Sequence, residues 1–175
     1  DRDIPAPPNL YTIQQNDKKL DVVSVVTKQG YIFVFDRVTG QPIYPIEEKS
    51  FPVSTIPGEQ TSETQPVPLL PEHFTRQSFT HEDINDFASN KEEIIGQMKQ
   101  TNTGSPFIPL GFNRSVFYPG TDGGAQWGGA AVDKNAVLYV PAKENPVFSS
   151  LKASDPKAGN MGNTTGKKLY ENWCM

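Results

Sequence analysis

The sequence predicts an all-β fold, and two features of its composition and patterning support that class. Sixteen prolines and 14 glycines divide the 175 residues into short segments, and hydrophobic residues make up 35% of the chain. Many short elements joined by turns suit such a composition better than long helices do. Two stretches rich in β-branched and aromatic residues, 20–26 and 31–35, have the length and composition of strands. The chain length allows one domain, or part of one.

The first 45 residues predict an extended arm followed by antiparallel strands. The prolines within residues 1–8 favour an extended, rigid arm. Short strands are expected at 11–13 and 20–26, with a polar turn between them that makes a hairpin. Residues 31–35 are almost entirely β-branched or aromatic, which predicts a strand buried on both faces. Residues 41–45 are expected to return as an edge strand.

The order of turn, strand and turn over residues 27–45 is typical of a β-propeller blade, whose antiparallel strands run outward from a central channel. A weaker copy of this order is expected from residues 115–118 together with 130–140, where the polar residues 133–135 mark the turn of a hairpin. The sequence therefore predicts a partial β-propeller of about two antiparallel, four-stranded blades.

The segment between the two predicted blades is long and proline-rich. Residues 45–79 also contain many threonines, serines and glutamines, and they predict an ordered excursion over a surface. Residues 149–168 are poor in hydrophobic side chains and predict a linker, so a boundary is expected near residue 150.

A short helical insert is predicted at about residues 80–101. Thr80 and Asp83 have the spacing of a capping box, which starts a helical turn. Ser89 and Glu92 repeat that spacing before isoleucines at helical intervals, so a second, longer helix is expected there.

Residues 119–132 form a glycine-rich stretch in which five glycines surround one tryptophan, Trp127. Glycine lets another surface approach the main chain closely, so the backbone of this loop is a candidate contact surface for a flat ligand. The alternative interpretation is an ordinary glycine-rich hairpin loop whose Trp127 packs into the core.

Charge and composition exclude several classes of function. The net charge is −4 and the basic residues are scattered, which is unlike a nucleic-acid footprint. His73 and His81 have no partner at zinc-ligand spacing, and no apolar run reaches the roughly 18 residues of a membrane span. Cys174 is the only cysteine, so no internal disulfide can form. A chain that opens on Asp1 rather than Met suggests processing or excision from a longer protein.

The pieces that carry a family resemblance lie at residues 1–8, 27–40, 47–49, 57–58, 64–66 and 119–129. Together they resemble the membrane-associated PQQ-dependent (quinoprotein) dehydrogenases of the glucose dehydrogenase type, which carry pyrroloquinoline quinone (PQQ) in an eight-bladed propeller. The resemblance covers most of residues 1–150 and implies that the chain is the C-terminal part of such a propeller.

The resemblance implies an active site built around Asp1 and Lys28. The family's catalytic base is an Asp with a second Asp two positions later, a pattern that matches Asp1 and Asp3. A basic residue 27 positions after the base reaches a quinone oxygen in the family, and Lys28 stands at that spacing. The ammonium group would stabilise developing charge, and the carboxylate would accept the proton of the substrate hydroxyl. Without the resemblance, Lys28 would be interpreted as an ordinary turn lysine.

The resemblance also implies cofactor contacts from Gln126 and Trp127, and a calcium or other metal ion for which Asp1 and Asp3 are candidate ligands. The family often has Asn where this chain has Gln126, and relatives tend to have Asn near the position of Pro141. The aromatic platform for the cofactor ring and the metal site's carboxylate and amide would lie upstream. The isolated chain is therefore expected to bind no PQQ.

Residues 166–175 resemble the start of a c-type haem segment and stop one residue after the first cysteine, Cys174, of a Cys-x-x-Cys-His motif. Two parts are thus predicted: residues 1–150 as the partial propeller, and residues 151–175 as a linker leading to a truncated cytochrome c motif. In the parent protein, electrons would pass to haem c on the adjoining domain.

The predicted function is that of a fragment of a periplasmic PQQ-dependent dehydrogenase that oxidises an alcohol, polyol or sugar hydroxyl and passes electrons to a cytochrome or a quinone. The fragment alone is expected to be inactive, and its predicted partners are the small-molecule substrate, the rest of the propeller and the cytochrome c domain. The alternative is a non-catalytic, propeller-like β domain that binds a protein or a carbohydrate through residues 45–79.

Overall fold

The structure is a computed structural model that describes residues 3–153. Its elements, in chain order, are β1 (Asn9–Gln15), β2 (Lys18–Val26), β3 (Ile32–Asp36), β4 (Ile46–Ser50), β5 (Thr64–Pro68), the 3-10 helix η1 (His81–Asp83), α1 (Lys91–Met98), β6 (Ser115–Phe117), β7 (Ala131–Val132), β8 (Leu138–Tyr139) and β9 (Val147–Ser149). All strand pairs among the described residues are antiparallel. The all-β class with a short helical insert is confirmed.

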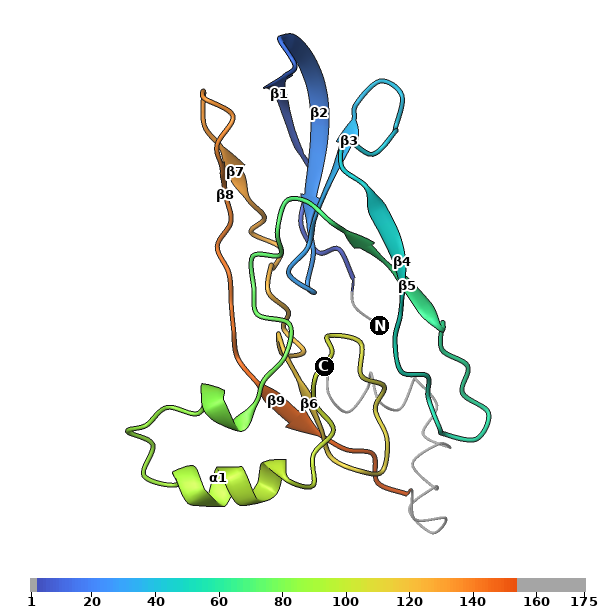
Figure 1. Cartoon of the computed structure of the whole chain (residues 1–175), viewed down its shortest axis with the longest axis vertical. Helices are drawn as coiled ribbons and strands as arrows, with labels where there is room; N and C mark the ends of the chain where they lie inside the picture. Colours follow the sequence, from blue (N-terminus) through green and yellow to red (C-terminus); the bar gives the residue numbers. More distant parts are fainter. Residues whose placement is uncertain (1–2, 154–175) are drawn as a thin grey trace, which may run out of the picture.

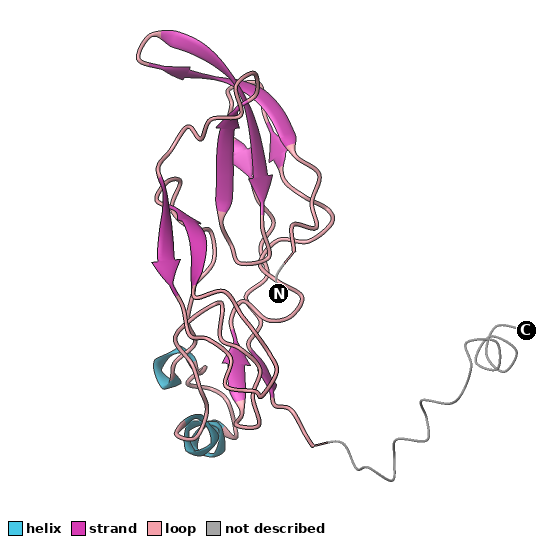
Figure 2. Ribbon diagram, turned by 90° about the vertical axis from the view of Figure 1, so that its right-hand side faces the viewer, coloured by secondary structure: helices cyan, strands magenta, loops and turns pink. Residues whose placement is uncertain are grey.

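The strands are divided between two ends of the molecule. In Figure 1 the sheets β1-β2-β3, β4-β5 and β7-β8 fan out in the upper half, while β6-β9 and α1 lie in the lower half. The side view shows the helices at the lower end only (Figure 2). The turn between β2 and β3 lies midway, where the upper and lower parts meet (Figure 1).

The three-stranded sheet forms as its sequence predicts. A tight turn joins β1 and β2 through Asn16 and Asp17, whose φ angles of 50° and 59° suit a two-residue hairpin. Along β2, residues 22, 24 and 26 are buried while their neighbours are partly exposed. This alternation places one face of β2 in a core cluster, which consists of Ala6, Val22, Val26, Ile32, Val34 and Ala125.

Two expectations for the end of this sheet need correction. The strand predicted at 31–35 to be buried on both faces alternates instead, because Ile32 and Val34 are buried but Phe33 and Phe35 are only half-buried. Residues 41–45 do not form an edge strand and keep a single bridge to β3. Prolines at both 42 and 45 remove the amide donors that a ladder requires.

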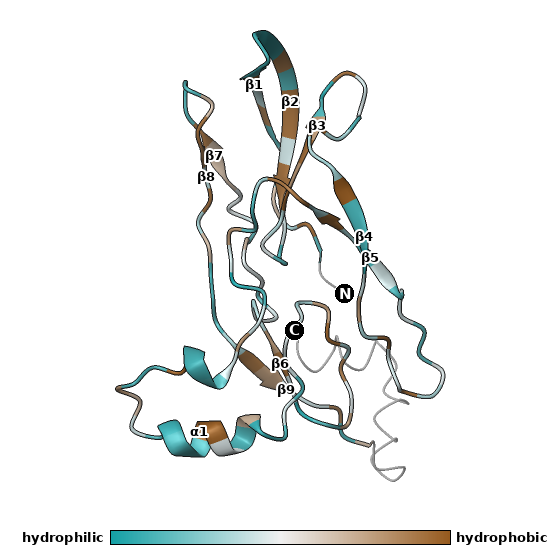
Figure 3. Cartoon of the chain, viewed as in Figure 1, coloured by the Kyte–Doolittle hydropathy of each residue, from teal (hydrophilic) through white to brown (hydrophobic). Residues whose placement is uncertain are grey.

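The excursion at 45–79 contains a hairpin that the sequence did not predict. Strands β4 and β5 pair over five positions, from Ile46 opposite Pro68 to Ser50 opposite Thr64. The sequence gives no sign of this hairpin, because the charged residues of β4 and the prolines of β5 are residue types that are depleted in strands. The hairpin projects from the upper half and is hydrophilic over most of β4 (Figure 3).

The lower half has its own core and differs from the predicted second blade. Strand β6 pairs with β9 rather than with residues 130–140, and β7 and β8 form a separate hairpin. The strands of residues 3–153 therefore lie in one three-stranded and three two-stranded sheets, not in two four-stranded ones. The lower core consists of Phe79, Ile84, Met98, Val116 and Tyr118, and the hydrophobic colouring of β6 and β9 reflects it (Figure 3).

The helical insert follows the predicted pattern at its start. Thr80 caps η1, with its hydroxyl accepting from Glu82 and the Asp83 carboxylate accepting from the Thr80 N–H, so the predicted capping box is confirmed. The N-cap of the second helix is Asn90, one residue after the predicted cap Ser89, and it makes no side-chain cap bond.

Candidate functional site

Lys28 lies in a tight turn that closes the β2-β3 hairpin. The Thr27 N–H donates to the Tyr31 carbonyl at 3.0 Å, and the Gly30 N–H donates to the Thr27 carbonyl at 3.1 Å. The Thr27 hydroxyl accepts from the Tyr31 N–H at 3.1 Å. Gly30 has a φ of 88°, a conformation that favours glycine. The turn therefore holds Lys28 in one backbone position at the junction of the two halves.

The Lys28 ammonium is ion-paired with a predicted site residue, Asp3. The Nζ–Oδ1 distance is 2.7 Å, and the Lys28 side chain keeps 22% of its surface exposed. The hydrogen bond from Lys28 lowers the pKa of Asp3 from its usual value, because it favours the charged carboxylate. Asp1 lies outside the described residues, so its role as catalytic base stays a prediction.

The glycine-rich loop packs directly on Lys28. The Gly124 N–H donates to the Lys28 carbonyl at 2.7 Å, and the Ala125 N–H donates to the Thr27 carbonyl at 3.3 Å. A Cβ added to Gly123, whose φ is 85°, would lie 2.3 Å from Lys28 Cγ and 2.8 Å from Lys28 Cα. Only glycine allows this close approach. Part of the loop backbone that was predicted to contact a flat ligand therefore contacts Lys28.

Trp127 and Gln126 occupy the open side of the same loop. Trp127 is 81% exposed, so the alternative that it packs into the core is wrong. The Gln126 side chain donates from Nε2 to the Asp122 carbonyl, a contact that fixes the amide within the loop. The cofactor contacts predicted for Gln126 and Trp127 are not tested by these positions and stay predictions.

Residues 74–77 support the Lys28 turn, a role that the sequence did not predict. The Phe74 N–H donates to the Gly30 carbonyl at 2.9 Å, and Gln77 Nε2 donates to the Gln29 carbonyl at 2.7 Å. A Cβ on Gly30 would meet Thr75 Oγ1 at 1.9 Å. The segment lies in the long excursion, where no local motif marked it, and only its closeness to the turn reveals its role.

The predicted metal ligands are placed only in part. Within residues 3–153 no group of three or more His, Cys, Asp or Glu side chains could hold a metal ion. Asp3 has Lys28 as its charged partner, and its role as a metal ligand stays a prediction. His73 and His81 are both exposed.

Two other predictions concern the chain near or beyond residue 153, the last residue that the structure describes. The cytochrome-like motif at 166–175 and most of the linker lie outside the described residues, so the boundary near residue 150 also stays a prediction. Among the described helices, none is long and apolar enough to cross a bilayer.

Comparison with known proteins identifies the family. Residues 1–173 match the family described as "PQQ: Glucose/ethanol/alcohol dehydrogenase, beta-propeller domain". The quinoprotein glucose dehydrogenase of Gluconobacter oxydans (strain 621H) is 34% identical over 164 residues, which cover 89% of this chain and 20% of that protein. The quinate/shikimate dehydrogenase (quinone) of Acinetobacter baylyi (strain ATCC 33305 / BD413 / ADP1) is 31% identical over 136 residues, covering 76% and 17%. The glycerol dehydrogenase large subunit of Gluconobacter thailandicus is 30% identical over 141 residues, covering 78% and 19%.

No solved structure matches significantly. The chain spans about a fifth of the length of the curated relatives it matches. The family match nevertheless extends over almost the whole chain and agrees with the all-β architecture. The chain therefore belongs to the PQQ β-propeller domain family of glucose, ethanol and alcohol dehydrogenases.

Proposed function

We propose that this chain is part of a PQQ-dependent dehydrogenase that oxidises the hydroxyl group of an alcohol, a polyol or a sugar. Its relatives bear the names of quinoprotein glucose dehydrogenase, quinate/shikimate dehydrogenase (quinone) and glycerol dehydrogenase large subunit. The observation that carries the proposal is the position of Lys28, whose ammonium is paired with Asp3 beneath the glycine-rich loop. The electrons would pass on to a cytochrome or to a quinone.

The residues around Lys28 fit a flat quinone. The ammonium has three donors, and Asp3 is its ion-pair partner at one of them, so donors remain for a quinone oxygen. Gly123 places no side chain beside Lys28. Trp127 offers an exposed aromatic face on the same loop, and planar rings stack well on such faces. Bound there, PQQ would supply the electron-accepting quinone.

The chain's own residues would divide the work of the reaction. Lys28 would hold a quinone oxygen and stabilise negative charge at that atom. Asp3 would keep the Lys28 side chain oriented through the 2.7 Å ion pair. Asp1 would accept the proton of the substrate hydroxyl as general base. Asp1 and Asp3 remain our candidate ligands for calcium or another metal ion, with the other ligands supplied by the rest of the full-length protein.

The setting of the full-length protein is part of the proposal. We place it in the periplasm, or on the membrane facing the periplasm, with haem c on an adjoining domain as one electron acceptor. This part rests on the resemblance to membrane-associated glucose dehydrogenases and to the start of a c-type haem segment. Because a ligand site needs walls on several sides, the isolated chain is expected to be inactive.

The decisive test is Lys28→Ala in the full-length protein. The substitution removes a contact to the quinone oxygen that is present in the bound state and strengthens as negative charge develops there, so kcat and kcat/KM should fall together by on the order of 10²-fold or more. The substrate KM should change much less. Retention of PQQ after gel filtration, measured by absorbance, gives a readout that does not depend on turnover and should fall as well.

Lys49→Ala is the matched control, because Lys49 is an exposed lysine in β4, paired with Gln65 of the excursion hairpin. It should leave both activity and PQQ retention near normal. Near-normal kcat of Lys28→Ala at saturating PQQ would reject the assignment, and so would an equal loss of activity in the Lys49 control.

A further inference from the structure

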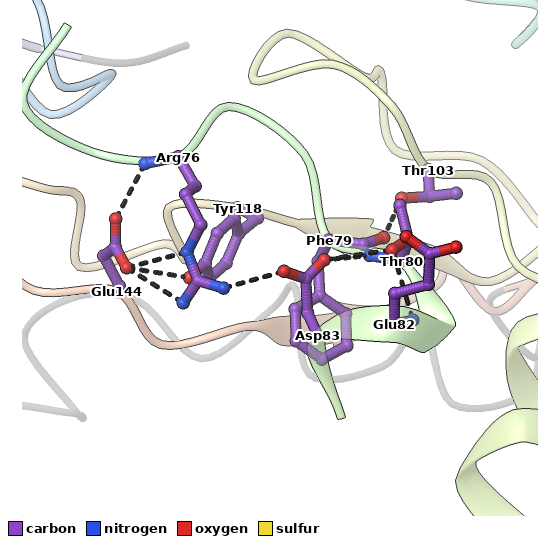
Figure 4. A network of polar contacts seen from close by, with 8 residues as sticks. All are labelled: Arg76, Phe79, Thr80, Glu82, Asp83, Thr103, Tyr118 and Glu144. Atoms are coloured by element: carbon purple, nitrogen blue, oxygen red, sulfur yellow. Dashed lines mark hydrogen bonds and ion pairs between the residues drawn. The ribbon is translucent and has the colours of Figure 1, made fainter. Parts of the chain in front are cut away.

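Arg76 lies in the segment that supports the Lys28 turn, but its side chain contacts a different part of the molecule. Figure 4 shows its guanidinium between Glu144 and Asp83. Glu144 accepts the Arg76 backbone N–H at 2.7 Å and Arg76 Nε at 2.9 Å, and it pairs with Nη2 at 2.9 Å. The carboxylate thus binds both the main chain and the side chain of Arg76, since Oε1 accepts the backbone N–H while Oε2 faces both Nε and Nη2.

Two further groups complete this network. Asp83 accepts from Arg76 Nη1 at 2.7 Å and is itself fixed by the Thr80 N–H at 2.7 Å. The hydroxyl of Tyr118 donates to Glu144 at 3.2 Å. Burial, followed by the charge of Glu144, raises the pKa of Tyr118 to about 12, which keeps the donor protonated. Burial opposes ionisation of Glu144, but hydrogen bonds from Arg76 and Tyr118 outweigh it, and the pKa of Glu144 is lowered.

The residues on either side of Glu144 hold the glycine-rich loop. The Lys143 N–H donates to the Gly124 carbonyl at 2.9 Å. A Cβ on Gly120 would lie 2.5 Å from the carbonyl oxygen of Asn145, so the two backbones touch there. The segment 143–145 therefore contacts the loop at two points, one of which is the glycine that binds Lys28.

We propose that Arg76 and Glu144 form a clamp that positions Lys28 for the cofactor. The clamp joins the segment that supports the Lys28 turn to the segment that holds the glycine-rich loop. Gly124 transmits the constraint, because its N–H binds the Lys28 carbonyl while its own carbonyl binds the Lys143 N–H. This inference rests on the proposed function, in which Lys28 contacts PQQ, and it makes Arg76 and Glu144 positioning residues that act through Lys28.

The exposure of the pair makes positioning separable from stability. The side chains of Arg76 and Glu144 are 54% and 33% exposed, so solvent screens their attraction and the loss of this pair should leave the fold intact. Variants of either residue are therefore expected to fold. Their effect should appear where a small displacement matters, in the affinity of the apo full-length protein for PQQ.

The test titrates PQQ at equilibrium into apo full-length variants and records their thermal midpoints in parallel. Glu144→Ala and Arg76→Ala should each weaken PQQ binding by about tenfold, less than the roughly 10²-fold that a 1 Å misplacement of a reacting group can cost in catalysis. Glu144→Gln should lose less, because its amide oxygen still accepts the Arg76 backbone N–H. Arg114→Ala is the control. Arg114 is an exposed arginine in the lower half, where its side chain contacts Gln97, and its loss should leave the affinity for PQQ unchanged.

A double-mutant cycle with Lys28 separates positioning from a general structural effect. If the clamp acts through Lys28, Glu144→Ala should add less than about twofold in the Lys28→Ala background, since residues in one network are not additive. In the apo protein, hydrogen exchange of the Gly124 amide should be faster in Glu144→Ala and unchanged in Arg114→Ala. Additive losses, or unchanged PQQ affinity in both clamp variants, would overturn the proposal.

The same experiment distinguishes failure of the clamp from failure of the proposed function. If Lys28→Ala loses PQQ affinity while Glu144→Ala and Arg76→Ala keep it, the clamp is overturned and the function stands. If Lys28→Ala keeps wild-type affinity and turnover, the proposed function falls, and the cofactor role of the clamp falls with it.

Discussion

Gly123→Ala should be one of the most damaging single-methyl substitutions in this chain. Two effects combine at this position. An alanine with a φ near 85° is in a left-handed conformation that costs about 1–2 kcal/mol. The new methyl would also lie 2.8 Å from Lys28 Cα, a backbone atom that no rotamer change can move, and overpacking of this kind costs about 1–3 kcal/mol. We expect a total destabilisation of about 2–5 kcal/mol.

Two other glycines serve as matched controls because they separate the two effects. Gly58 has a φ of 86° with nothing within 4 Å of the added methyl, so Gly58→Ala should show the conformational cost alone. Gly128 has neither a positive φ nor a neighbour within 4 Å, so Gly128→Ala should be neutral or slightly stabilising. From the most to the least stable variant, the expected order is therefore Gly128→Ala, Gly58→Ala and Gly123→Ala.

The assay compares denaturation midpoints of the apo full-length variants, and PQQ affinity is measured in the same preparations. The order of the midpoints is the informative quantity, since a large protein need not unfold in two states. Gly123→Ala should also weaken PQQ binding, because the strain is relieved only by moving Lys28 or the loop. A midpoint for Gly123→Ala no lower than that of Gly58→Ala would refute the packing of Gly123 on Lys28.

Four further outcomes are expected. Trp127→Ala should leave the denaturation midpoint of the apo full-length protein unchanged, since the Trp127 side chain is 81% exposed, but it should lower the affinity for PQQ. Phe87→Ala is the control and should change neither quantity, because the Phe87 side chain is 95% exposed on the helical insert. Ala136→Gly should raise the unfolding free energy by about 0.5–1 kcal/mol, measured by denaturant titration, because it relieves a φ of 62°. The pKa of Asp83 is lowered, mainly by the hydrogen bond that its carboxylate accepts from the Thr80 N–H. Wild type should therefore be more stable than Asp83→Asn above about pH 4. This advantage should vanish as the pH falls through the lowered pKa of Asp83. The isolated chain should not retain stoichiometric PQQ through gel filtration. Retention would show that this chain alone encloses enough of the cofactor to bind it.

Local patterns predicted the parts of the fold that depend on local chemistry. The first hairpin and the capping box at Thr80 form as predicted, because hairpins and caps are specified by neighbouring residues. The two strands of the hairpin, at 9–15 and 18–26, are longer than the predicted 11–13 and 20–26. The β6-β9 pairing joins segments about 30 residues apart, and both strands are only three residues long. Strands this short show no periodicity that identifies their partner, so the predicted blade that joins 115–118 with 130–140 is wrong.

The candidate site shows the same division. Lys28 and Asp3 were identified by spacing and by resemblance, and the structure brings their side chains together. The supporting segment 74–77 and its anchor Glu144 carry no motif, since a glutamine, an arginine and a glutamate on surface segments have many ordinary uses. Their importance follows from contacts between residues that are 46 to 68 positions apart, and a single sequence does not encode such contacts in a readable form.

The glycine-rich loop narrows what a ligand can touch. The sequence alone predicts that the backbone at all five glycines is one contact surface for a flat ligand. In the structure, Gly120, Gly123 and Gly124 are used by the protein itself, since a Cβ at any of them would overlap backbone or side-chain atoms of other segments, and Gly129 contacts Pro7. Only Gly128 has open space around it, beside the exposed Trp127. The first half of the loop therefore fixes Lys28, and a planar ligand that uses the loop has the short stretch 126–128 as its contact surface.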